Sequence, residues 1–289
     1  MNHKPVLLQE VINILNPKPG DFFIDGTIDG GGHAFEILKV ISPNGIFLGL
    51  DLDEEMIRAA KLKWQNHSSK IILVKANYTA LKEVLKKKKL SKADGLLLDL
   101  GVSSEQLEKS GRGFSFLRNE PLLMTYDKKA EPLYRALRRL SRQEIFEIIR
   151  LSDERYAGRI SEAIFKTERK KWIETTEDLV RVIESVVPKR GKIHPATKTF
   201  LAFRIYINNE LKNLVEVLAI LPEIIKKSGR VAIITFQSLE DKIVKEQFKK
   251  MVQKEEAELI NQKPLVPNFL EIRNNPRSRS AKLRAIKIN

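Results

Sequence analysis

The chain has 289 residues, 42% of them hydrophobic, enough to bury one large core or one main domain carrying a smaller one. Its 52 Lys and Arg against 37 Asp and Glu give a net charge of +15, which favours nucleic acid as a partner over a basic surface that is merely soluble. The absence of cysteine excludes disulfides, thiolate zinc sites and cysteine nucleophiles. The sequence has neither a signal peptide nor an apolar run of about 20 residues, which predicts a cytoplasmic protein without a membrane partner.

The N-terminal third alternates short apolar runs with amphipathic stretches. The runs "DFFIDGT", "GIFLGLD", "KIILVKA" and "ADGLLLDLG" have the composition of buried strands, and the segments between them have helical periodicity. This alternation predicts an α/β fold with a parallel, Rossmann-like sheet. After Gly101 no comparable strand occurs until "GRVAIITF" at 229–236.

The long segment between these strands is strongly charged and helical in pattern, as in "PLYRALRRLSRQEIFEIIRL". A structureless connection of this length would be unusual in a compact domain. We therefore expect 107–205 to form an inserted helical domain, with 1–106 and 206–289 together forming the main domain.

The C-terminal part offers two local patterns. Ser238 and Asp241 match a capping box, with Ser238 as the N-cap of the helix that follows "GRVAIITF". The last segment, "NNPRSRSAKLRAIKIN", has five basic residues and no acidic one, and it predicts a basic turn followed by a final strand at the sheet edge. Such a run is either a solvated face or a contact for phosphates.

The stretch "FIDGTIDGGGH" at 23–33 has four glycines within seven residues, between a predicted strand and a predicted helix. It does not match the dinucleotide fingerprint G-x-G-x-x-G, because Phe35 stands where the third glycine would be. A loop this rich in glycine still predicts a ligand close to the backbone. His33 either caps the helix or contacts the ligand, and without a neighbouring carboxylate or cysteine it predicts no metal site.

Asp25, Asp51 and Asp99 each end a predicted strand. Because the carboxyl ends of parallel strands share one edge of a sheet, we expect the three carboxylates on one rim, with Asp51 placed to accept hydrogen bonds from a ribose. Three acids suit a cationic or neutral nucleoside better than a pyrophosphate, and S-adenosylmethionine has a sulfonium, a ribose and no phosphate. Taken singly, each acid is equally well explained as a strand-end cap.

Eight motifs together are similar to one known family: "HKPVLLQEV", "DGTIDGGGH", "LDLGVSSEQL", "RGFSF", "HPATKTFLAFRI", "NNEL", "SLEDKIVK" and "NPRSRSAKLR". They resemble the RsmH (MraW) family of S-adenosylmethionine-dependent N4-cytidine methyltransferases of 16S ribosomal RNA, over His3 to Arg284. The resemblance implies a class I methyltransferase with a mostly parallel seven-stranded sheet, acting on a cytidine of the decoding region in the small subunit. It also implies that the methyl donor contacts Gly31, Gly32, His33, Asp51, Tyr78, Asp99 and Gln106.

Methylation of cytosine at carbon 5 normally uses a cysteine that adds to the ring, and this chain has none. Direct displacement remains, in which the enzyme orients and desolvates the reactants. We expect Asp99 both to bind the donor and to lie near the amine, with Ser103 and Ser104 as helix caps or substrate contacts. The basic tail and the inserted domain are candidate contacts for RNA, the latter through Arg138, Arg139, Arg142, Lys170 and Lys171.

The sequence departs from the family pattern at two places. "GPLDMRMD" is here "EPLLMTYD", which places Leu123 and Thr125 where the family has Asp and Arg, and "SFHSLED" is "TFQSLED", which places Gln237 where it has His. These changes keep open a catalytically altered paralogue that acts as an RNA-binding ribosome-assembly factor. A nicotinamide-dependent oxidoreductase is a further alternative, which the broken glycine fingerprint disfavours. The oligomeric state stays open, with a homodimer as one option.

Overall fold

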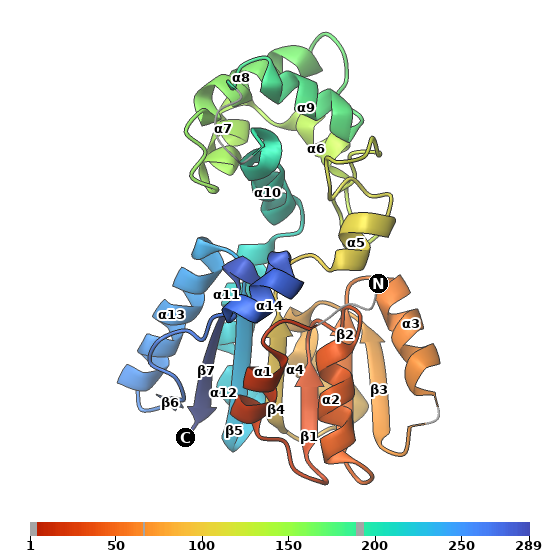
Figure 1. Cartoon of the computed structure of the whole chain (residues 1–289), viewed down its shortest axis with the longest axis vertical. Coiled ribbons are helices and arrows are strands. Elements are labelled where there is room, and N and C mark those ends of the chain that lie inside the picture. Colours follow the sequence, from red (N-terminus) through yellow and green to blue (C-terminus); the bar gives the residue numbers. More distant parts are fainter. Residues whose placement is uncertain (1–4, 66, 189–193) are drawn as a thin grey trace. The chain divides into compact units, whose positions relative to one another are not determined.

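The computed structural model describes residues 5–65, 67–188 and 194–289 (Figure 1). His3, where the first family motif begins, lies outside the described residues. The chain divides into two compact units, one of Met1–Gly101 and Leu211–Asn289 and the other of Val102–Glu210. The borders expected from the sequence, 107 and 205, lie inside the second unit, and its role in substrate recognition stays a prediction.

The first unit is built on a seven-stranded sheet with the order β3-β2-β1-β4-β5-β7-β6. Strands β1 to β5 are parallel, β7 is antiparallel to β5, and β6 is antiparallel to β7. This confirms the predicted Rossmann-like fold with a mostly parallel sheet. The strands are β1 (Phe22–Asp25), β2 (Ile46–Asp51), β3 (Lys70–Lys75), β4 (Ala93–Asp99), β5 (Ile225–Thr235), β6 (Ala257–Leu259) and β7 (Lys282–Ile288).

Two details of the C-terminal strands differ from the sequence prediction. The final strand β7 is not at the sheet edge, because β6 pairs along its outer side. A strand of three residues that includes an exposed glutamate has too little apolar alternation to be recognised in a sequence. Strand β5 begins at Ile225, four residues before Gly229, and its pairing with β4 shifts register between Ala93 and Gly95.

Helices cover both faces of the sheet, as a buried parallel sheet requires (Figure 1). Successive residues of β1 alternate between the two faces, so that Ile24 belongs to one hydrophobic core and Phe23 to the other. The Phe23 side is covered by α1 (Leu8–Leu15), α2 (Gly32–Ile41) and α3 (Glu54–Trp64). The Ile24 side is covered by α4 (Leu81–Lys88), α11 (Glu210–Ala219), α12 (Leu221–Ile224) and α13 (Ser238–Gln253).

The second unit is helical and has a hydrophobic core of its own. The periodic stretch at 132–151 forms two helices rather than one, because Ser141 caps the second helix in a capping box with Glu144. None of the helices in the described parts of the chain combines the length and apolar content needed to cross a bilayer. The helices of this unit are α5 (Ser104–Lys109), α6 (Leu133–Arg139), α7 (Arg142–Arg150), α8 (Ala157–Glu168), α9 (Thr176–Glu184) and α10 (Ala196–Ile207).

The capping box predicted at Ser238 is wrong. The N-cap of α13 is Gln237, which makes no side-chain capping bond, and Ser238 is the first helical residue. Asp241 instead accepts hydrogen bonds from Lys282 at 3.0 Å and from Arg284 at 2.6 Å. Both cations lie on β7, so a tertiary ion pair takes the carboxylate that the local pattern assigned to the helix end.

Candidate functional site

Three aspartates converge at the carboxyl edge of the sheet. Asp25 ends β1, Asp51 ends β2 and Asp99 ends β4, and β1 lies between the other two strands. All three residues are buried, with exposures of 1%, 8% and 7%. The predicted rim of strand-end acids is therefore present, at the point where the strand order reverses and α/β folds bind their ligands.

Two of these carboxylates also organise the backbone around them. Asp25 accepts a hydrogen bond from the N–H of Thr27 at 3.0 Å. Asp51 accepts one from the N–H of Asp29 at 3.1 Å and one from the N–H of Asp53 at 2.8 Å. The strand-end cap that the sequence left as an alternative thus applies to Asp25 and Asp51, which fix the loops on either side of the rim.

The glycine-rich loop after β1 is held across the sheet. The N–H of Gly26 donates to the carbonyl of Leu97 on β4, at 3.0 Å. Gly31 has a φ of +68°, and a Cβ on it would lie 2.6 Å from Cζ2 of Trp64. Both the conformation and the packing therefore require glycine there. Tyr78 belongs to the same neighbourhood, since its Cβ is 3.1 Å from where a Cβ on Gly26 would be.

Asp99 differs from the other two acids because one of its oxygens has no partner in the described chain. Oδ1 is buried without a hydrogen bond, and Oδ2 lies 3.5 Å from Nδ1 of His33. The expectation that His33 has no neighbouring carboxylate is wrong, because α2 places it beside the end of β4. A buried carboxylate oxygen without a donor is costly. Oδ1 is therefore suited to a ligand that brings a donor or a positive charge.

The hydrogen bonds of His33 fix where its proton lies. Nε2 is 2.8 Å from the carbonyl oxygen of Val6, and since a carbonyl only accepts, Nε2 carries a hydrogen. Nδ1 is then either a bare acceptor or the second N–H of an imidazolium. Nδ1 is therefore the nitrogen that faces Oδ2 of Asp99.

Burial and like charges shape the acidity of the rim. Burial, and to a smaller extent the carboxylate of Glu240, raise the pKa of Asp99 to about 7. Burial likewise raises the pKa of Asp25 and of Asp29 well above their usual range, with repulsion from neighbouring aspartates adding to it. A chain with a net charge of +15 thus has a local concentration of acids whose repulsion a bound cation would relieve.

Sequence reasoning missed three residues of this rim: Thr27, Asp29 and Glu240. The hydroxyl of Thr27 accepts the N–H of Asp99 at 2.7 Å and so ties the glycine-rich loop to β4. Asp29 adopts a left-handed φ of +47°, and Glu240 is 2% exposed near the start of α13. Thr27 and Asp29 stand inside the family motif "DGTIDGGGH", which was the available signal. Glu240 likewise stands inside the motif "SLEDKIVK", but only the fold shows that it lies near Asp99.

The profile of the MraW methylase family matches residues 1–289. This chain belongs to the MraW methylase family. Its relatives include three proteins named ribosomal RNA small subunit methyltransferase H. That of Acetivibrio thermocellus is 44% identical over 98% of each chain. That of Syntrophus aciditrophicus is 41% identical over 98% of this chain and 96% of its own. That of Persephonella marina is 38% identical over 99% of each.

Membership of the MraW methylase family makes the chain a methyltransferase with S-adenosylmethionine as its methyl donor, and it disfavours the oxidoreductase and the silent assembly factor. The residues present fit that donor. The unpartnered Oδ1 of Asp99 and the mutually repelling acids suit a sulfonium, whereas they would repel a pyrophosphate. Among the described residues no group of three or more His, Cys, Asp or Glu is arranged to hold a metal ion.

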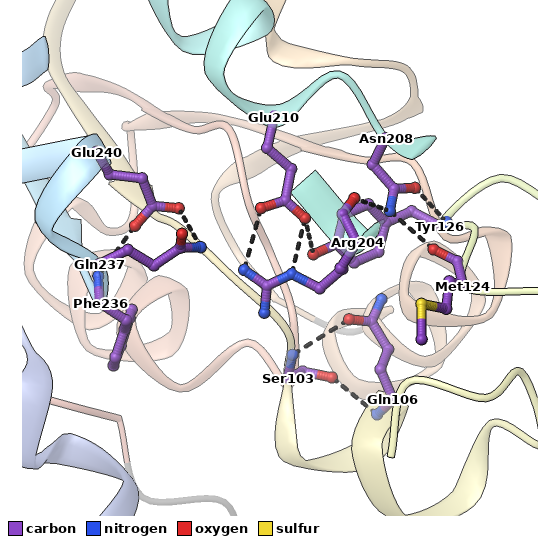
Figure 2. A network of polar contacts seen from close by, with 10 residues as sticks. All are labelled: Ser103, Gln106, Met124, Tyr126, Arg204, Asn208, Glu210, Phe236, Gln237 and Glu240. Carbon is purple, nitrogen blue, oxygen red and sulfur yellow. Dashed lines mark hydrogen bonds and ion pairs between the residues drawn. The ribbon is translucent and has the colours of Figure 1, made fainter. Parts of the chain in front are cut away.

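Three predicted site residues of this MraW methylase belong to the second unit. Ser103 caps α5 in a capping box: its hydroxyl accepts the N–H of Gln106 at 3.0 Å, and its own N–H donates to Oε1 of Gln106 at 3.1 Å (Figure 2). Ser104 is the first residue of α5. Of the two roles left open for Ser103, helix capping is therefore present. Contacts of Gln106 with the donor and of either serine with substrate stay predictions.

The segment that departs from the MraW pattern is anchored through its backbone. Asn208 donates to the carbonyl of Met124 at 2.8 Å and accepts the N–H of Tyr126 at 2.9 Å (Figure 2). Arg112 donates to the carbonyl of Tyr126 at 2.8 Å. The side chains at Leu123 and Thr125 take no part in these bonds. Residues of the motifs "RGFSF" and "NNEL" thus hold the backbone of the segment in place.

A second polar cluster in the same unit completes this anchor. The guanidinium of Arg204 binds both oxygens of Glu210, at 2.8 and 3.0 Å, and the hydroxyl of Tyr126 donates to Glu210 at 3.0 Å (Figure 2). Planar, two-point pairing of this kind is geometrically specific. The other altered residue, Gln237, lies in the first unit. Its side chain donates a hydrogen bond to Glu240 at 3.2 Å, and the carboxylate of Glu240 is one of the groups that raise the pKa of Asp99.

Most cations named as candidate RNA contacts are already paired with acids. Four of the five in the helical unit form ion pairs, and so do three of those in the tail. The pairs of the helical unit are exposed, weak and readily exchanged, so they do not prevent phosphate binding, whereas the pair of Arg284 with Asp241 is largely buried. The pairs are Arg138 with Glu174, Arg139 with Glu131, Arg142 with Glu162, Lys171 with Asp178, Lys282 and Arg284 with Asp241, and Lys287 with Glu258.

Proposed function

We propose that this chain transfers a methyl group to the exocyclic N4 amine of a cytidine in the decoding region of 16S ribosomal RNA. The observation that carries the proposal is the buried, unpartnered Oδ1 of Asp99 on a rim of strand-end acids. The rim offers a cation-binding surface, and Asp99 offers an acceptor for an amine hydrogen. The family relationship supplies the class of substrate, since the relatives named above are ribosomal RNA small subunit methyltransferases.

The residues of the first unit divide the task of holding the donor. Asp51 lies at the end of β2, where a carboxylate accepts hydrogen bonds from ribose hydroxyls. Gly31 and Gly32 contact the donor through the glycine-rich loop, whose backbone packs closely on Trp64 and Pro5, and Tyr78 lies beside this loop where an aromatic ring packs against adenine. S-adenosylmethionine supplies an electrophilic methyl group on its sulfonium.

Asp99 activates the amine by accepting one of its hydrogens. The lone pair of a cytosine amine is shared with the ring, so the amine is a poor nucleophile until that pair is drawn out of the plane. A hydrogen bond from N4 to Oδ1 of Asp99 favours this geometry and orients N4 toward the methyl group. The nitrogen releases one proton once it carries the new methyl, and the Asp99–His33 pair, with a carboxyl pKa of about 7, can accept it.

This chain has no cysteine, so it lacks the nucleophile that normally forms the covalent adduct in methylation of cytosine at carbon 5. Direct transfer to an amine needs no nucleophile from the protein, and the rim residues bind and orient the reactants and accept the released proton. The target base has to be unstacked or already in a loop to enter such a site. A small subunit with an exposed decoding region meets this condition; a cytoplasmic location and a homodimer stay predictions.

The decisive experiment supplies tritiated S-adenosylmethionine and small subunits that lack the modification, and then maps the labelled nucleoside. We expect label on the amine of one cytidine. Label on another base would keep the enzyme class but reject the target. Binding of the subunit without any transfer would favour the assembly factor.

A further inference from the structure

The helical unit contains a pocket formed entirely by its own residues. It lies between the end of α6, the start of α7 and the end of α8 with the turn that follows, and its volume is about 370 Å³. This is the lower end of the range for small-molecule sites, large enough for one nucleoside and too small for a helix.

Aromatic and guanidinium groups are stacked along the wall of this pocket. Trp172 is 58% exposed, although large aromatic residues are usually buried. The guanidinium of Arg138 lies 3.8 Å from the centroid of its ring and is held there by an ion pair with Glu174 at 2.7 Å. A second stack places Arg169 at 4.3 Å over Phe165. An indole fixed in this way is a ready platform for a further planar group.

The same pocket has a hydrogen-bond acceptor in need of a donor. Glu168 lines the pocket, and its Oε1 accepts the N–H of Ile173 at 2.8 Å. Its Oε2 is buried without a partner among the described residues. Such an oxygen gains a hydrogen bond when a ligand brings an N–H or an O–H. The pocket thus combines a stacking surface with one polar acceptor, the two elements by which proteins hold a single unstacked base.

We propose that this pocket binds one unpaired nucleotide of the RNA substrate, with its base on Trp172 and a base-edge or ribose hydrogen donated to Glu168. Adjacent phosphates contact Arg169 and Lys170, for which the described chain shows no ion pair. RNA is favoured over a protein partner by the net charge of +15 and by guanidinium–aromatic stacking at the pocket wall. The inference rests on the proposed function, because it names a second contact for the same RNA, in addition to the target cytidine.

The test compares Trp172→Ala with the wild-type chain in binding a fluorescein-labelled single-stranded RNA of about 15 nucleotides and a duplex of the same length. We expect the variant to bind the single strand about tenfold more weakly, the loss typical of one stacking contact, and the duplex as the wild type does. With small subunits as substrate, KM should rise by a similar factor while kcat is unchanged, since none of the pocket residues belongs to the rim of acids.

Two further variants separate binding from folding. Trp172→Phe keeps a ring and should restore most of the affinity, whereas a merely structural role would make both variants unfold at a lower temperature than the wild type. Arg169→Ala is matched by Arg150→Ala, which removes an equivalent guanidinium 5.7 Å from the ring centroid of Phe146 on α7. Arg169→Ala should weaken single-strand binding, and Arg150→Ala should not.

The outcomes are distinguishable from failure of the proposed function. If wild-type protein methylates the subunit and Trp172→Ala binds the single strand as tightly as wild type, the pocket proposal is wrong while the function stands. If Trp172→Ala loses affinity for subunits but not for the RNA probe, the pocket binds a ribosomal protein and the proposal is overturned. If wild type transfers no methyl group but the single-strand difference persists, the pocket survives and the proposed function fails.

Discussion

Asp99 and Asp241 occupy two regions of the first unit and are almost equally buried, at 7% and 8% exposure. Their pKa values move in opposite directions. Burial and the nearby carboxylate of Glu240 raise that of Asp99 to about 7. At Asp241 burial acts in the same sense, but hydrogen bonds and charges from Arg284 and Lys282 outweigh it and lower the pKa. Burial alone therefore does not set the pKa of an acid, because a Lys or Arg beside the carboxylate reverses its effect.

The largest expected effect comes from removing the carboxylate of Asp99. Asp99→Ala should lower kcat for methyl transfer about 10²- to 10³-fold, the loss typical of one preorganised polar contact in a transition state. The measurement is single-turnover transfer from tritiated donor to small subunits. Asp21→Asn, at the opposite edge of the same sheet, is the control and should keep normal activity. Unchanged transfer by Asp99→Ala would refute the role given to Oδ1.

The packing of the glycine-rich loop beside the rim can be tested separately from the charges of the acids. Gly31→Ala should destabilise the fold by about 2–4 kcal/mol, since a Cβ there is strained by φ and meets Trp64. Gly20→Ala is a matched control, with a φ of +88° and no atom within 4 Å of the added Cβ. It should cost only about 1 kcal/mol. Chemical denaturation of both variants measures the difference, and equal losses would mean that packing on Trp64 is unimportant.

The pH dependence of stability should separate the two acids. The raised pKa of Asp99 in the folded state disfavours its charged form. Its contribution to the free energy of unfolding is therefore complete below the unfolded value of 3.8 and is lost as pH rises toward about 7. The side chain of Asn resembles the protonated acid. The free energy of unfolding of Asp99→Asn should therefore rise relative to that of the wild type between about pH 4 and pH 7, by at most about 1.4 kcal/mol per pH unit. Thermal unfolding of both proteins across this pH range is the measurement. A stability difference that does not change with pH would contradict the prediction.

The smallest effect is expected at the paired acid, and with the opposite sign. The lowered pKa of Asp241 means that its stabilisation is present above its unfolded value of 3.8 and is lost as pH falls below it. Asp241→Asn should cost about 1–2 kcal/mol at neutral pH and little in acid. Chemical denaturation of the variant and the wild type, at neutral pH and in acid, measures this loss of stability. Greater stability of Asp241→Asn at neutral pH would show that Lys282 and Arg284 do not compensate for the burial of this carboxylate.

Much of the site could be predicted from local pattern. The three strand-end aspartates follow from apolar runs that each end in Asp, because parallel strands place their carboxyl ends on one edge. The His33 contact could not be predicted, since it joins a helix start to a strand 66 positions further along the chain. The capping box at Ser238 failed for a related reason: a local pattern competed with cations on β7, and the tertiary ion pair prevailed.

The sequence by itself determined the alternation of strands and helices, the glycine-rich loop, the excess of positive charge and the absence of a cysteine nucleophile, because each depends on composition or short-range periodicity. Tertiary structure alone decided which acids remain without a cation, which nitrogen of His33 faces Asp99, and that β6 rather than β7 ends the sheet. These features depend on which distant groups come within a few ångströms, and a short-range pattern carries no information about that.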